Sequence, residues 1–154
     1  MAEITEYTRD YFWVFFLFAV AWVVLMAFLA ARRRLEHGLP VRPTVPPEAR
    51  FSETWTSGRS KRSVFTRLAS ANNCLLVAVT DTALVIHPHF PFNLFLGEAS
   101  GLDQSIRRES IVRVSEARGM FGQTVEVEFR TSSGREAVEL RLRQPGKFVA
   151  ALQG

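Results

Sequence analysis

The segment YFWVFFLFAVAWVVLMAFLAA, residues 11–31, separates the chain into two unlike parts. It contains no Asp, Glu, Lys, Arg or His, and aromatic residues dominate its first half. Because a helix rises about 1.5 Å per residue, a helix over this segment matches a hydrocarbon core roughly 30 Å thick. We therefore predict one transmembrane helix over 11–31, which holds the residues after it close to a membrane.

The charges on either side of this segment indicate its orientation. Residues 1–10 carry three acidic residues against one arginine, whereas Arg32, Arg33 and Arg34 follow the apolar segment directly. Basic residues are retained on the cytoplasmic side, so we predict a single-pass inner-membrane protein with residues 1–10 as an outer tail and a cytoplasmic C-terminal domain. A cleaved secretory signal is the competing interpretation, but the acidic start and the long apolar core disfavour it.

The sequence after the helix first predicts a linker. Four prolines lie between residues 40 and 47 and prevent a continuing helix, so we expect a stiff, extended, basic linker over 32–58. Within it, Phe51 and Trp55 either pack on the following domain or lie at the lipid interface. The remaining residues, 59–154, suffice for one small domain with a single core.

The basic residues around this linker predict contact with the membrane surface. An anionic inner leaflet attracts such residues, with about 1 kcal/mol for each one that reaches it. The residues that we assign to this surface are Arg32, Arg33, Arg34, Arg59, Lys61, Arg62 and Arg67. Nucleic acid is the other polyanion to consider, but the chain lacks the aromatic and basic interleaving of single-strand binders and any helix-turn-helix pattern. We therefore expect membrane lipid, and no nucleic acid, as a partner.

The pattern after residue 73 is typical of antiparallel strands. An apolar run over 75–80, a turn at Asp81-Thr82 and a return over 83–87 predict a hairpin. Three further segments alternate apolar and polar residues, which predicts strands with one packed and one wet face; they are 111–115, 124–130 and 137–143. A loop at 131–134 joins the last two as a hairpin. We expect cross-strand ion pairs between Glu126 or Glu128 and Arg141 or Arg143.

Two segments predict short helices. Pro145 opens a segment over 145–152 with an apolar stripe, which favours an amphipathic helix at the end of the chain. Residues 61–69 place Val64, Phe65 and Leu68 at helical spacing, and either a basic amphipathic helix or a first strand fits this pattern. The single cysteine, Cys74, cannot form an internal disulfide, and its apolar neighbours predict a buried, inert thiol.

The order of these elements resembles the pleckstrin-homology-like superfold, including its bacterial membrane-tethered and GRAM-type members. The segments that carry the resemblance are 77–86, 106–114, 125–143 and 148–152. The resemblance implies a small, mainly antiparallel β domain, as a barrel or sandwich, with a C-terminal helix. It also implies seven strands, so two strands beyond the five evident ones are expected within 48–66 and 97–108. The family implies a binding module, often for lipid head groups or protein segments.

The Phe-rich segment 87–96 is the most unusual part of this domain. Its large apolar residues, which we take as a candidate interface, are Phe90, Phe92, Leu94, Phe95 and Leu96. A core element that closes one end of the β domain is the favoured interpretation, because Phe-rich segments usually pack inside. The alternatives are a wedge that enters the inner leaflet and a docking surface for another membrane protein.

Other polar clusters predict no chemistry. His87 and His89 are two possible metal ligands without a third, so we expect no metal. The cluster Arg107, Arg108 and Glu109 fits either a head-group site or, preferably, a solvated strand edge. No nucleophile or paired acid and base has a recognisable spacing, so we expect neither an enzyme nor a cofactor.

These observations together predict a function class. We expect a membrane-tethered, non-enzymatic binding module at the cytoplasmic face of the inner membrane, which contacts anionic lipid, a protein partner or both. The alternative is an accessory single-pass subunit of a larger integral membrane complex, with the Phe-rich segment as its interface.

Overall fold

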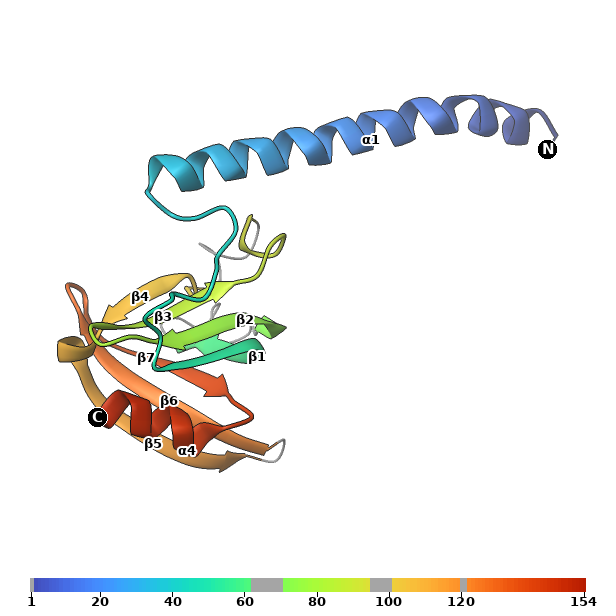
Figure 1. Ribbon diagram of the computed structural model, residues 1–154. Helices are drawn as coiled ribbons and strands as arrows, with labels where there is room; N and C mark the ends of the chain where they lie inside the picture. Colours follow the sequence, from blue (N-terminus) through green and yellow to red (C-terminus); the bar gives the residue numbers. More distant parts are fainter. Residues whose placement is uncertain (1, 62–70, 95–100, 120–121) are drawn as a thin grey trace. The chain divides into compact units, whose positions relative to one another are not determined.

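The computed structural model describes residues 2–61, 71–94, 101–119 and 122–154 (Figure 1). The chain divides into two compact units, Met1–Val41 and Arg42–Gly154. The first unit holds one long helix, and the second holds an antiparallel β domain with a C-terminal helix. This architecture is the one that the sequence predicts.

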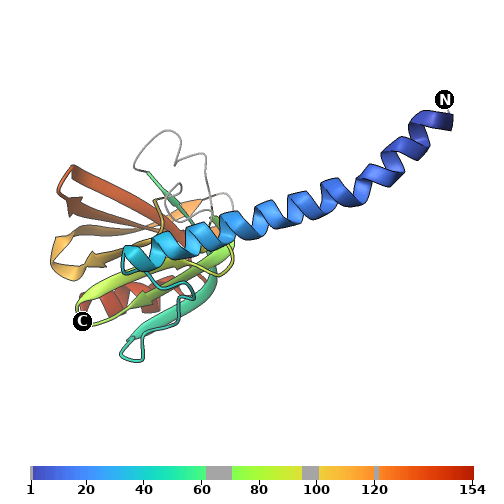
Figure 2. The ribbon, with the colours of Figure 1, turned by 90° about the horizontal axis from the view of Figure 1, so that it is seen from above.

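The long helix α1 spans Ala2–Glu36 and runs without a break through the apolar segment (Figure 2). Within it, Tyr11–Glu36 is long and apolar enough to cross a membrane. Apolar side chains are exposed all around this stretch, as expected of a helix whose surroundings are lipid. The helix extends beyond the predicted 11–31 at both ends, so residues 2–10, predicted as a tail, are helical. In its last turn Arg32 Nε lies 3.1 Å from Glu36 Oε1, an i,i+4 ion pair.

Helix α1 ends in a glycine turn. Gly38 has a φ of +69°, a left-handed conformation that glycine adopts without steric cost, and the Leu39 N–H donates to the Arg34 carbonyl at 2.8 Å. The Arg34 guanidinium donates to the Pro40 carbonyl oxygen at 3.1 Å. These contacts determine the direction in which the chain leaves the helix.

The β domain begins earlier than the sequence predicted. Its first strand, β1, spans Phe51–Ser60, so residues 51–58 belong to the sheet and not to the linker of 32–58. The reason for the error is local: irregularities in β1 interrupt the alternation by which a strand is recognised. Residues 62–69 of the predicted helix or first strand, including Arg62 and Arg67, lie outside the described residues.

Seven strands form one antiparallel sheet in the order β4-β3-β2-β1-β7-β6-β5. The strands after β1 are β2 (Ala71–Val79), β3 (Ala83–Pro88), β4 (Gln104–Arg107), β5 (Ile111–Gly119), β6 (Gly122–Thr131) and β7 (Gly134–Arg141). The hairpins predicted at 75–87 and at 124–143 are confirmed. The two further strands expected within 48–66 and 97–108 are present as β1 and β4.

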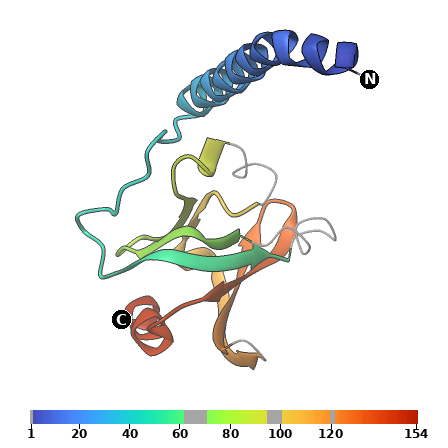
Figure 3. The same ribbon diagram turned by 90° about the vertical axis from the view of Figure 1, so that its right-hand side faces the viewer.

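The sheet is strongly curled. Strands β4 and β5 lie at its opposite edges, yet only the three-residue turn η1 (Arg108–Ser110) joins them. A flat sheet of seven strands is roughly 29 Å across, whereas such a connection reaches at most about 14 Å. The two halves must therefore turn toward each other, and in Figure 3 β1–β3 cross β5–β7 at a large angle.

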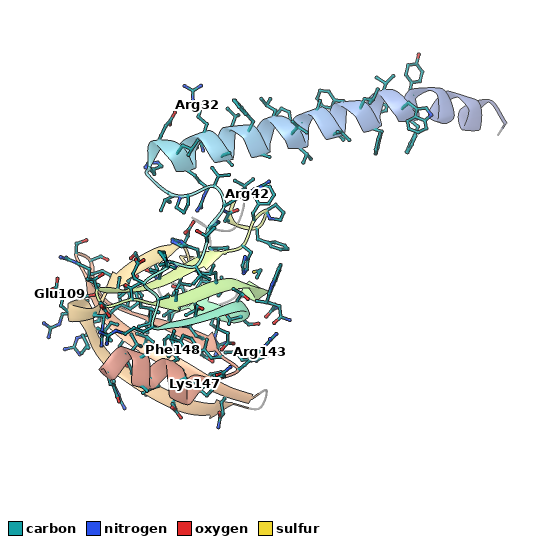
Figure 4. The ribbon with its side chains drawn as sticks, viewed as in Figure 1. Arg32, Arg42, Glu109, Arg143, Lys147 and Phe148 are labelled. Atoms are coloured by element: carbon teal, nitrogen blue, oxygen red, sulfur yellow. The ribbon has the colours of Figure 1, made fainter. Side chains whose placement is uncertain are left out.

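The core lies between the two halves and under the C-terminal helix α4 (Pro145–Gln153), as predicted. Buried residues from both halves belong to a single cluster; they include Leu75, Val77, Leu84, Ile86, Val125, Val127, Val138 and Leu140. Helix α4 adds Phe148, which is fully buried and meets the Phe51 ring edge-on at 5.6 Å (Figure 4). Cys74 is also buried, and burial raises the pKa of its thiol, so the inert thiol that we predicted fits its surroundings.

Polar contacts attach one end of α4 to strand β1 and the other end to the turn η1. The Glu53 carboxylate accepts the backbone N–H groups of Arg143 at 2.8 Å and Gln144 at 3.3 Å, just before the helix begins. At the other end, Arg108 Nη2 donates to the Leu152 carbonyl at 2.5 Å. The carboxylate lies at the positive end of the helix and the guanidinium at the negative end, so both charges favour the helix dipole.

The predicted ion pairs of the last hairpin are wrong. Thr131 faces Gly134 across the turn, and this register places Glu126 opposite Glu139. Cations from β1 and the residue after it neutralise these two carboxylates: Arg59 lies 2.8 Å from Glu139, and Lys61 lies 2.7 Å from Glu126. The sequence pattern identified the hairpin, but the partners depended on a third strand that alternation did not reveal.

Candidate functional site: an exposed aromatic tip

A β-bulge in β1 sets the position of Trp55. Thr54 pairs with Leu76 and Thr56 pairs with Leu75, so Trp55 is an extra residue without a partner in the ladder. Before the bulge Phe51 faces the core, whereas after it the even-numbered residues Thr56 and Gly58 are buried. A bulge changes which side chains face inward, and here it leaves Trp55 52% exposed.

The backbone at Trp55 is strained. Its φ of +61° lies in the left-handed region, where a bulky side chain is rare and costs of order 1–3 kcal/mol. A second irregularity lies opposite, at Asn73, where φ is +48°. There the Ser57 hydroxyl accepts the Asn73 N–H at 2.9 Å, a contact that bridges β1 and β2 at this irregularity.

The chain between β3 and β4 begins with a hydrogen-bonded turn. The His89 N–H donates to the Cys74 carbonyl at 2.6 Å, and the His89 carbonyl accepts the Asn93 N–H at 3.0 Å. The Pro91 carbonyl accepts the Leu94 N–H at 3.1 Å. The first of these bonds attaches the start of the Phe-rich segment to β2, and the other two close the turn.

Side chains from three separate parts of the domain meet at this turn. The His89 imidazole stacks on the Trp55 indole, with ring centroids 4.5 Å apart and planes 19° apart. The Arg42 guanidinium carbon lies 5.3 Å from the centroid of the Phe90 ring, a cation–π contact (Figure 4). We call Arg42, Trp55, His89, Phe90 and Phe92 the aromatic tip.

The exposure of this tip corrects the favoured interpretation of the Phe-rich segment. Phe90 is 45% exposed and Phe92 is 43% exposed, so neither is a core residue of the domain. Leu94 is half-buried, and Phe95 and Leu96 lie outside the described residues. Three backbone hydrogen bonds shape this turn, one of them to β2, and both phenylalanine rings are about half exposed on it.

His89 is the titratable member of the tip. Burial lowers the pKa of its imidazole below the ordinary value of 6.5. Its Nε2 is buried without a hydrogen-bond partner among the described residues. A neutral ring therefore suits this position, since protonation would place a charge on a ring nitrogen that is buried without a hydrogen-bond partner within the residues that the structure describes.

The basic residues assigned to the membrane surface have different surroundings. Arg32 and Arg33 are exposed at the end of α1, whereas Arg34 is buried and donates to the Pro40 carbonyl. Arg59 and Lys61 form ion pairs with glutamates on the sheet. Only part of the predicted cationic surface is thus available for lipid in the described part of the chain.

The two histidines do not form a common site. His87 Nδ1 lies 2.5 Å from Asp103 Oδ1 and both side chains are largely buried, while His89 turns to Trp55. Among the described residues there is no group of three possible metal ligands.

The charged cluster before β5 is also divided. Arg107 and Glu109 pair at 3.1 Å on the exposed strand edge. Arg108 instead contacts the end of α4, so its guanidinium has a structural role. This arrangement fits the solvated edge that we preferred over a head-group site.

The sequence suggested some members of the tip but not the whole. Trp55, Phe90 and Phe92 are large aromatic residues that were already singled out in the sequence. Arg42 instead lies in the segment predicted as linker, and His89 was considered only as a metal ligand. Only the bulge and the turn bring these side chains together. Comparison with protein-family models, curated proteins and solved structures found no match for the chain.

Proposed function

We propose that the protein is a membrane-tethered, non-enzymatic binding module whose β domain works at the cytoplasmic face of the inner membrane. The single observation that carries this proposal is the short connection between a membrane-spanning candidate and the domain. Helix α1 ends at Glu36, and the compact unit that contains the β sheet begins at Arg42, although the first strand starts only at Phe51. Such a connection confines the domain to the layer next to the bilayer.

The fold of the domain supports a binding role. Seven antiparallel strands followed by a terminal helix fit the pleckstrin-homology-like superfold, whose members serve mainly as binding modules. The exposed Arg32 and Arg33 lie at the end of α1, where they favour a cytoplasmic orientation and contact with anionic lipid.

Two fusion proteins test the membrane anchor and its orientation. A C-terminal green fluorescent protein fusion should fluoresce and remain in the membrane after an alkaline carbonate wash, whereas a C-terminal alkaline phosphatase fusion should be inactive. Release by carbonate, or an active phosphatase fusion, would contradict the anchor or its orientation.

Purification of the tagged full-length protein in mild detergent then identifies its partner. Anionic lipid enriched with an otherwise isolated protein supports the lipid-contacting module. A stoichiometric set of integral membrane proteins would instead favour the accessory-subunit alternative, with the aromatic tip as the first interface to mutate.

A further inference from the structure

We infer that the aromatic tip inserts into the boundary between head groups and acyl chains of the membrane that α1 spans. This inference rests on the proposed function and assigns the contact to particular residues. Trp55, Phe90 and Phe92 supply exposed aromatic surface, and Arg42 supplies a cation beside it. Aromatic rings and basic side chains are the residue types that favour this boundary.

The covalent chain keeps the tip near the bilayer. Arg42 belongs to the tip and is also the first residue of the compact domain. Fully extended, the chain from Glu36 to Arg42 spans at most about 21 Å, and the helical residues after 31 add roughly 8 Å. The chain therefore keeps Arg42, a member of the tip, within about 29 Å of the end of the apolar segment.

The backbone at Trp55 points to a role for its side chain. Glycine would adopt the φ of +61° without strain, yet the chain carries its largest residue type there. The bulge turns this indole outward, where the described domain covers only about half of it. Backbone strain of this kind gathers at sites of function, and a lipid contact gives an exposed indole such a function.

The distribution of charge favours insertion over attraction to anionic head groups. On the sheet, Glu139 and Glu126 already neutralise Arg59 and Lys61. Arg42 is the one basic residue of the tip, so the apolar contribution of its rings exceeds the electrostatic one. Contact of the tip with the bilayer should therefore change little with salt or with the content of anionic lipid.

The sole-tryptophan protein gives a direct test. The chain has three tryptophans, and Trp13→Phe with Trp22→Phe leaves Trp55 as the only one. This full-length protein is placed in nanodiscs whose phosphatidylcholine carries bromine on its acyl chains. We expect Trp55 to lose most of its emission to the brominated lipid, with unbrominated lipid as reference, in neutral and in anionic bilayers and at low and high salt.

Two further variants of this protein show whether the tip causes the effect. Phe90→Ser with Phe92→Ser should reduce the quenching, while its matched control, Val112→Ser, changes an exposed apolar residue on β5 and should leave it unchanged. Circular dichroism of each variant should match that of the parent, and a variant with a lost β signal is replaced by the milder Phe90→Leu with Phe92→Leu.

Three results would overturn the inference. Quenching by aqueous acrylamide alone would show that the tip faces water, and shielding from both quenchers would show that protein covers it. Quenching by brominated lipid only in anionic bilayers at low salt would show a charge-driven contact. Incorporation of the protein into the nanodisc tests the transmembrane anchor separately. A tip that does not contact lipid is therefore distinguished from a helix that does not anchor the protein.

Discussion

Strand β1 carries two aromatic residues, one buried in the core and one exposed at the surface. Phe51, at its start, packs edge-on against Phe148 of α4 in the core. Trp55, four residues later, stacks on His89 at the surface and stays 52% exposed. A strand of regular alternation would direct positions 51 and 55 to the same face, and the bulge between Thr54 and Thr56 prevents this.

This contrast assigns one aromatic residue of β1 to the stability of the domain and the other to interaction at its surface. The inner pair, Phe51 and Phe148, packs in the core of the domain. The outer pair, Trp55 and His89, lies at its surface. Substitutions at the inner pair should therefore change the free energy of unfolding, and those at the outer pair should change membrane contact.

Phe148→Ala should have the largest effect. It removes a fully buried ring from the contact with Phe51 and leaves a cavity, which costs about 3–5 kcal/mol in the free energy of unfolding. Chemical unfolding of the full-length protein in micelles, followed by circular dichroism, measures it. Lys147→Ala, at an exposed position of the same helix, is the control (Figure 4); equal losses for the two variants would contradict the account.

Gly58→Val should have the next largest effect. A Cβ at Gly58 would lie 2.9 Å from side-chain atoms of both Leu75 and Leu140, and 3.1 Å from the Glu139 carbonyl oxygen. Overpacking between β1 and its neighbours should destabilise the domain by about 1–3 kcal/mol in the same assay. Gly146→Ala is the matched control, because nothing lies within 4 Å of its Cβ and alanine favours the helix. A stable Gly58→Val protein would show that the sheet around β1 is looser than described.

Trp55→Gly should change stability by less than about 1 kcal/mol, because relief of the strained φ offsets the lost stacking on His89. The variant should nevertheless weaken the contact of the domain with lipid. Attenuated total reflection infrared spectroscopy of supported bilayers measures this as a broader orientation of the β domain. A large loss of stability, with the orientation unchanged, would make Trp55 a structural residue and remove the contrast with Phe51.

The smallest effect should be a dependence on pH at His89. Burial lowers the pKa of this ring in the folded domain, while the unfolded chain keeps a pKa near 6.5. The unfolded state thus binds more protons below that pH, and the free energy of unfolding falls as the pH drops from 6.5 toward the folded pKa. The dependence fades over about one pH unit above 6.5, where the unfolded ring also loses its proton. His89→Phe retains an aromatic ring without the titration and should flatten the curve; an unchanged slope would place the dependence elsewhere.

The sequence predicts best where the pattern of apolar residues is local. The apolar helix, the hairpin around Asp81 and the amphipathic α4 all follow from short-range periodicity and turn residues. The predicted start of the β domain at residue 59 was wrong because the bulge at Trp55 breaks the alternation of β1. The predicted partners of Glu126 were also wrong. Its salt bridge to Lys61 depends on which strand lies beside β7, and the sequence of a single hairpin does not contain that information.

The candidate site was predictable only in part. Phe90 and Phe92 were candidates because they are large and apolar, but their exposure depends on how the turn packs on the domain, which the sequence pattern does not report. Arg42 and Trp55 join them through contacts between distant segments, which no local pattern reports.

The most direct test of the account compares two exposed positions of the domain in one bilayer. One protein keeps Trp55 as its only tryptophan; the other carries Trp13→Phe, Trp22→Phe and Trp55→Phe together with Val112→Trp, at an exposed apolar position of β5. Both are placed in nanodiscs with brominated lipid, and their quenching is compared. We expect strong quenching at position 55 and little at position 112. Equal quenching at the two positions, or stronger quenching at 112, would contradict it.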